Sequence, residues 1–115
     1  MSDAPIKKEI IYVLADDSSL KIMKLLDRNE SSARLISTSL NMPLSTTYRK
    51  IKRLEQLKII KTTKVVRTLD GLDEFFYTLS IKEIKVTYKN NALSFTLKQK
   101  EMDEKIVRLW QKFKD

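Results

Sequence analysis

The side chains that most often catalyse reactions or hold metals are sparse in this 115-residue sequence. It contains no histidine and no cysteine. Imidazole acid–base catalysis, thiolate nucleophiles and the usual ligands of zinc, copper and nickel are therefore absent. Acidic residues do occur in neighbouring pairs, and paired carboxylates are groups that could hold Mg²⁺. These pairs are Asp16 with Asp17, Asp73 with Glu74 close to Asp70, and Asp103 with Glu104.

A structural role explains each acidic pair better than a metal site does. The first is placed to cap a helix, the second lies at a turn, and the third begins a helix, where negative charge is favoured. No glycine-rich stretch accompanies any pair to hold a phosphate, and the serine-rich stretches lack a base in a nucleophile motif. We therefore expect no enzymatic activity, no cofactor and no transition-metal effector.

The chemistry that the sequence does favour is the binding of a polyanion. The chain has 23 basic and 15 acidic residues, a net charge of +8. Residues 45–67 alone carry eight basic residues and one acidic residue, a net charge of +7. Concentrated positive charge attracts polyanions and accelerates their capture. Nucleic acid is therefore the first partner to consider, although a solvated lysine-rich helix face would give the same pattern.

Short helices are predicted for the first half of the chain, because apolar residues recur there at three- and four-residue spacing. Ser31 or Ser32 is placed to cap the third helix and Ser45 the fourth. Asn41 favours a left-handed end to the third helix, and Pro43 favours a break after it. The last two helices would thus form a helix-turn-helix. The predicted helices cover residues 6–14, about 18–27, about 33–40 and about 45–57.

After residue 60 the pattern changes from helical to alternating. Residues 61–69 and 75–80 flank Asp70-Gly71, a strong turn signal, and predict a hairpin placed as a wing. A second hairpin, with one apolar and one polar face, is predicted around Asn90-Asn91. The predicted fold is α+β and forms a single domain. It is a winged helix-turn-helix (helix-turn-helix about 18–57, wing about 61–80) with an additional C-terminal β-hairpin and terminal helix (about 81–115).

The predicted terminal helix, residues 99–113, has an apolar stripe wider than one side of a thin sheet easily covers. Its members are Met102, Ile106, Leu109, Trp110 and Phe113, with Val107 beside them. Large apolar patches generally mark interfaces, so we expect this helix to form a homodimer. Two alternatives remain open: the stripe packs on the apolar face of the second hairpin, or the dimer forms through the first helix.

Three segments of the chain resemble a known family. Leu14-Ala15-Asp16 with residues 20–26 (LKIMKLL) resembles the opening helix of ArsR-like winged-helix transcriptional regulators. Residues 44–55 (LSTTYRKIKRLE) resemble their recognition helix, and Ile59-Ile60 resembles the beginning of the wing. The resemblance spans residues 8–80 and implies a DNA-binding dimer that represses or activates transcription. The lysine- and isoleucine-rich, glycine-poor composition suits an archaeal member.

The chain also departs from the pattern of that family. Asp17 and Ser19 stand where members often have Pro and Arg, and Lys58 stands where a glycine commonly follows the recognition helix. A left-handed Lys58 would cost roughly 1–2 kcal/mol, so we expect the last turn of this helix to end differently. The Cys and His ligands of the metal-sensing members are missing, so a metal-sensing role is not carried over.

The fourth helix carries most of the expected DNA contacts. Thr47, Ile51 and Leu54 share one face, which we expect to pack on the other helices while the opposite face enters the major groove of double-stranded DNA. Arg49 is the expected base contact, because its planar fork binds guanine O6 and N7 together. The other expected contacts, to phosphates, sugars or flanking backbone, are Ser45, Thr46, Tyr48, Lys50, Lys52, Arg53, Lys64 and Arg67. Tyr48 could equally pack at the edge of the helix.

Two other functions fit the same residues. The chain could be a protein-interaction module of a transcription or other assembly, or a non-specific nucleic-acid or chromatin-binding protein. The charge of residues 45–67 favours nucleic acid over a protein partner. The longest apolar run, residues 10–15, is far shorter than the ~20 residues of a membrane-spanning helix, and no secretion leader is recognisable. We expect a cytoplasmic, nucleoid-associated protein, with any small-molecule effector unknown.

Overall fold

A computed structural model describes residues 4–100 of the chain. It contains four helices, α1 (Ala4–Ala15), α2 (Asp17–Arg28), α3 (Ala33–Leu40) and α4 (Leu44–Gln56). The strands are β1 (Ser31–Ser32), β2 (Ile60–Arg67), β3 (Asp73–Leu79), β4 (Ile81–Lys89) and β5 (Ala92–Gln99). Two compact units divide the chain: the first ends at Ile81 and the second begins at Lys82.

Capping side chains explain where α2 and α3 begin. The Asp16 carboxylate accepts a hydrogen bond from the Ser19 backbone N–H at 3.1 Å, and the Ser32 hydroxyl accepts one from the Leu35 N–H at 3.3 Å. Both bonds satisfy N–H groups that have no partner within the helix. The predicted cap at Ser32 is confirmed.

The predicted cap of α4 at Ser45 is wrong. This helix begins one residue earlier, and Pro43 occupies the capping position with an extended backbone, φ −58° and ψ 140°. The Pro43 carbonyl accepts hydrogen bonds from both the backbone N–H and the hydroxyl of Thr47, each at 3.0 Å. Because the proline ring fixes φ, it sets the start of the helix and leaves Ser45 inside the first turn.

Left-handed residues end both helices of the helix-turn-helix. Asn41 has φ 52° and Lys58 has φ 62°. After α4 the Lys58 N–H donates to Glu55 O and the Ile59 N–H donates to Leu54 O, both at 3.0 Å. This is the Schellman pattern, in which two otherwise unpaired carbonyls are satisfied. The left-handed Asn41 is confirmed, whereas the expectation that α4 would avoid a left-handed Lys58 is wrong.

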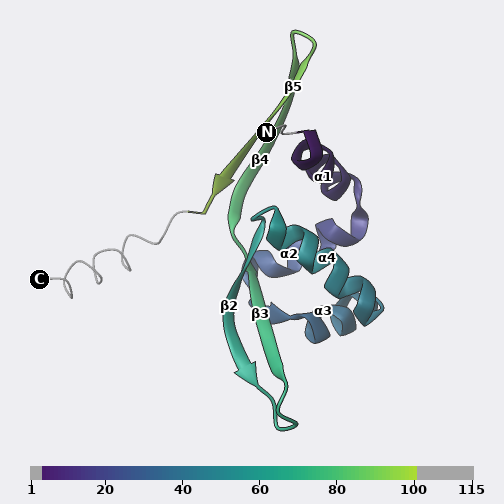
Figure 1. Ribbon diagram of the computed structural model, residues 1–115, viewed down its shortest axis with the longest axis vertical. Coiled ribbons are helices and arrows are strands. Elements are labelled where there is room, and N and C mark those ends of the chain that lie inside the picture. Colours follow the sequence, from purple (N-terminus) through teal and green to yellow (C-terminus); the bar gives the residue numbers. More distant parts are fainter. Residues whose placement is uncertain (1–3, 101–115) are drawn as a thin grey trace, which may run out of the picture. The chain divides into compact units, whose positions relative to one another are not determined.

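The helices pack beside a three-stranded antiparallel sheet with the strand order β1-β3-β2 (Figure 1). A short β1 pairs Ser31 with Tyr77, and β2 pairs with β3 along its length, with a bulge at Thr63. The core of this unit consists mainly of branched aliphatic side chains from the helices and the strand ends. Its fully buried members include Val13, Ile22, Leu26, Ile36, Ile51, Leu54, Ile59 and Ile60.

Turn residues with positive φ close both hairpins at the predicted places. Gly71 has φ 83° between β2 and β3, where the Thr68 carbonyl accepts from the Gly71 N–H at 3.0 Å. Asn90 and Asn91 have φ 53° and 61° between β4 and β5. Two consecutive left-handed residues form the tight turn whose twist matches that of paired strands.

The second unit contains a two-stranded ribbon, β4–β5. Along β5 the half-buried residues Leu93, Phe95 and Leu97 alternate with exposed ones, as predicted. On β4, in contrast, the predicted apolar residues Val86 and Tyr88 are exposed. The predicted terminal helix and its apolar stripe lie outside the described residues, and the organisation as a single domain stays a prediction. Within residues 4–100, no helix is long and apolar enough to cross a membrane.

Candidate nucleic-acid interface

The two sides of α4 differ sharply in exposure. Thr47, Ile51 and Leu54 are buried, as the spacing predicts. The opposite side presents a stripe of exposed residues at four-, three- and four-residue steps, which places them along one face. This exposed stripe consists of Ser45, Arg49, Lys52 and Gln56.

Arg49 and Lys52 are the cations of this stripe. Neither side chain has an ion pair with any carboxylate in the described part of the chain, where the four ion pairs involve other basic residues. Both are exposed, so their charges face solvent rather than a protein acid. Both cationic groups are therefore accessible to a ligand from solvent.

Lys50, by contrast, is not part of the accessible surface of α4. The residue is only 7% exposed, and its Nζ lies 2.6 Å from Asp16 Oδ2 at the start of α2. The sequence predicts a phosphate contact for this lysine; in the structure its ammonium is held in a largely buried ion pair, so such a contact would require that pair to open. The same Asp16 oxygen accepts from the Ser19 backbone N–H and, at 2.6 Å, from its hydroxyl.

This cluster of donors shifts the titration of Asp16. The hydrogen bond from Lys50, followed by that from the Ser19 hydroxyl, holds the pKa of the Asp16 carboxyl below its usual range. Hydrogen bonds to the charged form of a carboxylate stabilise that form. Asp16 thus stays ionised over the whole neutral range and ties the start of α2 to α4.

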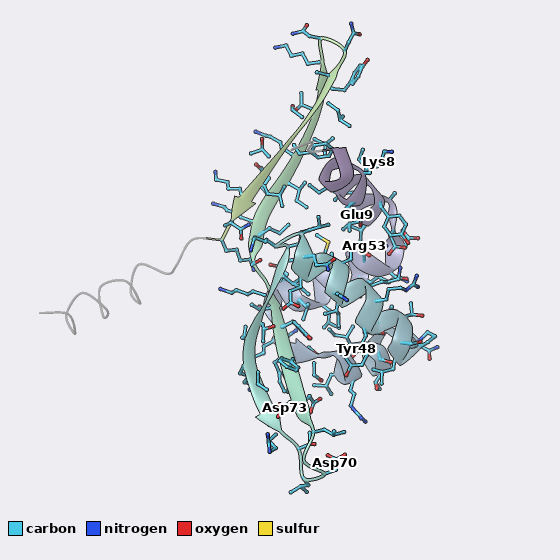
Figure 2. The ribbon with its side chains drawn as sticks, viewed as in Figure 1. Lys8, Glu9, Tyr48, Arg53, Asp70 and Asp73 are labelled. Atoms are coloured by element: carbon cyan, nitrogen blue, oxygen red, sulfur yellow. The ribbon has the colours of Figure 1, made fainter. Side chains whose placement is uncertain are left out.

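Arg53 is held at the edge of the helix by α1. Its Nε lies 2.9 Å from Glu9 Oε2, and its guanidinium carbon lies 4.2 Å from the centre of the Tyr12 ring. Figure 2 shows Glu9 on α1 and Arg53 on α4 close to each other. The ion pair uses Nε, while the stacking on Tyr12 fixes the plane of the guanidinium, a geometry that arginine favours.

Acidic partners also hold two of the three basic residues of the wing, Lys64 and Arg67. Lys64 Nζ lies 3.0 Å from Glu30 Oε1 and 4.8 Å from the centre of the Phe76 ring, and Arg67 Nε lies 3.5 Å from Asp73 Oδ1. The hydrogen bond from the Thr63 hydroxyl, followed by that from Lys64, lowers the pKa of Glu30. Both pairs are largely exposed, and such pairs contribute little to stability, so a phosphate could replace either carboxylate.

These pairs reduce the charge that a ligand meets on residues 45–67. Four of the eight basic side chains there are neutralised by carboxylates from outside the segment. The net charge of +7 in the sequence therefore falls to +3 once those four partners are included. The carboxylates are Glu9, Asp16, Glu30 and Asp73.

The tip of the wing is acidic. Asp70, Asp73 and Glu74 line a hollow of about 340 Å³ together with Arg34 and Tyr48; Figure 2 labels Tyr48 on α4 and the two aspartates on the wing. The Thr68 hydroxyl, by its hydrogen bond, lowers the pKa of Asp70. Negative charge at this tip opposes close approach of a phosphate. Tyr48 itself is 51% exposed at the rim of this hollow.

No cluster of three or more acidic residues that could hold a metal ion occurs among residues 4–100. Within that range, each predicted acidic pair has a member with a structural partner: Asp16 holds Lys50, and Asp73 holds Arg67.

Sequence reasoning missed the residues of α1 that contact α4. Glu9 and Tyr12 hold Arg53, and Asp16, predicted only as a cap, also holds Lys50. The apolar pattern shows that α1 is a helix but not which of its polar residues contacts a helix some forty residues later. No local feature of the sequence could have revealed these pairs.

One comparison with solved structures supports the architecture. HlyU from Vibrio cholerae N16961, in its reduced form, matches with a TM-score of 0.53 and 22% sequence identity, covering 67% of this chain and 75% of that chain. The fold is a winged helix. No protein-family model matches the sequence, and no curated protein matches it. At this level of identity the likeness establishes the fold alone.

Proposed function

We propose that this winged-helix protein is an ArsR-like, non-enzymatic transcriptional regulator of the cytoplasm that binds double-stranded DNA as a homodimer. The observation that carries the proposal is the exposed stripe of α4, whose Arg49 and Lys52 have no acidic partner among residues 4–100. In a winged helix this surface is the one that enters the major groove. An unpaired arginine there is suited to read guanine.

The proposed contacts differ in what they contribute. Arg49 contacts a base edge, while Lys52 and the terminal nitrogens of Arg53 contact phosphates, which give register and affinity without sequence information. Ser45 and Thr46 lie in the first turn of α4, where free backbone N–H groups suit a phosphate. Tyr48, half-exposed beside them, contacts the sugar–phosphate backbone. Lys64 and Arg67 contribute less to DNA affinity, because each must first break its ion pair with a carboxylate of the protein.

The test of this function is a binding titration of the full chain against genomic fragments at several salt concentrations. We expect a few fragments to bind with affinities about 10³-fold or more above the rest at physiological salt. Uniform affinity for every fragment would instead identify a non-specific nucleic-acid-binding protein. No binding to any fragment, even at low salt, would contradict the proposal.

Replacement of Arg49 by alanine, compared with replacement of Lys52, should separate base selectivity from the electrostatic affinity for any DNA. We expect Arg49→Ala to weaken binding to the preferred fragment by about 1–3 kcal/mol and to relax selectivity at one base position. Lys52→Ala should weaken all fragments alike and reduce the slope of log K against log salt by about one unit for each bound protomer. Fluorescence anisotropy on matched and single-base variant duplexes measures both effects. Equal binding by wild type and both variants would remove α4 from the interface.

A protein-interaction module is the second candidate, and one observation favours it. The wing tip exposes Leu69 and Leu72 beside three carboxylates, a surface suited to a basic, apolar protein partner rather than to DNA. Absence of DNA binding in the titration would make this candidate the better one.

A further inference from the structure

The second hairpin is strongly basic, although the chain around it is not. Residues 81–100 contain five lysines and one glutamate, a net charge of +4, whereas residues 68–80 contain three carboxylates and no basic residue. Outside α4, positive charge therefore lies on the ribbon β4–β5 as well as on β2, and not at the tip of the wing.

Most of these lysines fall on one face of the ribbon. Side chains alternate between the two faces of a strand, and on β5 the apolar residues are the half-buried ones. The Ser94 hydroxyl donates to the Thr87 carbonyl at 3.4 Å, which places these residues opposite each other. With this register, Lys85 and Lys89 of β4 share the polar face with Lys98 of β5.

The three lysines of this polar face are exposed, and in the described part of the chain none has an ion pair with a carboxylate. Glu83, the one acid of the two strands, lies on the same face at the start of β4 without an ion pair to any of them. Lys64 and Arg67 of the wing, in contrast, each contact an acid.

We infer that the polar face of β4–β5 binds the phosphate backbone of duplex DNA as a second contact surface in addition to that of α4. The inference rests on the proposed function and adds to it a surface that the wing does not supply. A two-stranded ribbon fits the dimensions of a DNA groove. Lys85 and Lys89 are four residues apart on an extended strand, a distance of about 13 Å. Four successive nucleotides of one DNA strand rise by a similar distance along the helix axis, about 3.4 Å each.

The chemistry of this face is suited to phosphates rather than to bases. It carries lysine ammonium groups and the hydroxyls of Thr87 and Thr96, which are common phosphate contacts. It lacks the arginine, asparagine and glutamine side chains that read base edges by two hydrogen bonds. The ribbon should therefore raise affinity for all sequences alike and leave selectivity to α4.

The experiment removes the three charges together. The variant Lys85→Gln, Lys89→Gln, Lys98→Gln should lower the slope of log K against log salt by about three units for each bound protomer and weaken every duplex by about 10- to 500-fold per protomer at 0.1 M salt. The ratio of specific to non-specific affinity should stay constant. Replacing the same three lysines by arginine should retain binding, because the positive charge is kept.

A matched control removes the same charge from helices outside the proposed DNA surface: Lys8→Gln, Lys21→Gln, Lys24→Gln. We expect this variant to change the slope by less than about one unit. If the two triple variants showed the same salt slope and the same DNA affinity, while Arg49→Ala still reduced selectivity, the ribbon surface would be overturned and the proposed function would stand. Unchanged DNA binding with lost binding to phosphatidylserine vesicles would overturn it in favour of a membrane surface. Failure of the wild type to bind DNA would overturn both.

Discussion

Asp16→Ala should lower the free energy of unfolding by about 3 kcal/mol, because one carboxylate both caps α2 and neutralises a buried lysine. Its Oδ2 accepts from Ser19 and lies 2.6 Å from Lys50 Nζ. Alanine would leave the N–H of Ser19 without this acceptor and the 7%-exposed Lys50 without a counter-charge. Urea denaturation followed by circular dichroism measures the loss.

Two variants separate the cap from the ion pair. Asp16→Asn keeps a good capping residue and removes only the charge, so it should retain part of the stability that alanine loses. Asp17→Ala, which removes a neighbouring exposed aspartate, should cost less than about 1 kcal/mol. If the Asp16→Ala and Asp17→Ala variants had the same free energy of unfolding, the ion pair of Asp16 with Lys50 would not stabilise the fold.

The same pair predicts a dependence on pH. The pKa of Asp16 is lowered in the folded state, so its contribution is fully present above the unfolded value of about 3.9. The contribution disappears as the pH falls through the lower folded value. The stabilities of wild type and Asp16→Asn should therefore converge below about pH 4 and stay separated at neutral pH. A constant difference between them down to pH 2 would contradict this assignment.

The combined change Ile106→Gln and Trp110→Gln should convert the protein to a folded monomer. Both residues belong to the predicted apolar stripe of residues 99–113, and aromatic side chains are frequent energetic anchors of interfaces. A monomer binds one half-site at a time, so affinity for an inverted repeat should fall by about 10²-fold or more. Sedimentation equilibrium measures the oligomeric state, and anisotropy measures the affinity.

The control for this change alters the opposite side of the predicted helix, Glu104→Gln with Arg108→Gln, and should leave the dimer intact. A doubly substituted chain that remained dimeric would move the interface to α1, where Ile11 and Tyr12 are 43% and 45% exposed. A monomeric wild type would remove the homodimer, and the inverted-repeat site with it, from the proposed function.

Elements with local causes could be predicted from the sequence. Asn41 and Asn90-Asn91 tolerate positive φ, and Gly71 adopts it freely, so their turns were recognisable from residue type. The short strand β1 was missed because two residues give no periodicity; only pairing with Tyr77 and Phe76 makes Ser31–Ser32 a strand.

Lys50 shows where residue type misleads. Thr47, Lys50, Ile51 and Leu54 follow the spacing of a single helix face, and all four are buried. Lysine is seldom buried unless it is paired. The residue type therefore predicts that Lys50 is exposed, whereas its position on the helix predicts that it is buried. The partner that reverses this preference, Asp16, lies 34 residues earlier, and no local pattern connects them.

The charge of the C-terminal half shows the effect of averaging. Residues 68–115 have a net charge of only +1, which hides a charge of −3 on residues 68–80 and of +4 on residues 81–100. The boundaries of β3 and β4 are what divide the segment in this way. Charge counted by structural element, rather than by stretch of sequence, identifies the ribbon.

The left-handed backbone at Lys58 bears on how this protein could evolve. Glycine at this position would relieve a clash of roughly 1–2 kcal/mol and lose about 0.4–1 kcal/mol through a more flexible unfolded chain. A substitution of Lys58 by glycine could therefore raise the free energy of unfolding modestly, at a site outside the exposed stripe of α4. New specificity usually arises through substitutions that destabilise, and a protein tolerates them only above a threshold. A lineage that acquired glycine here would have more stability to lose, and could accept destabilising substitutions that its ancestor could not.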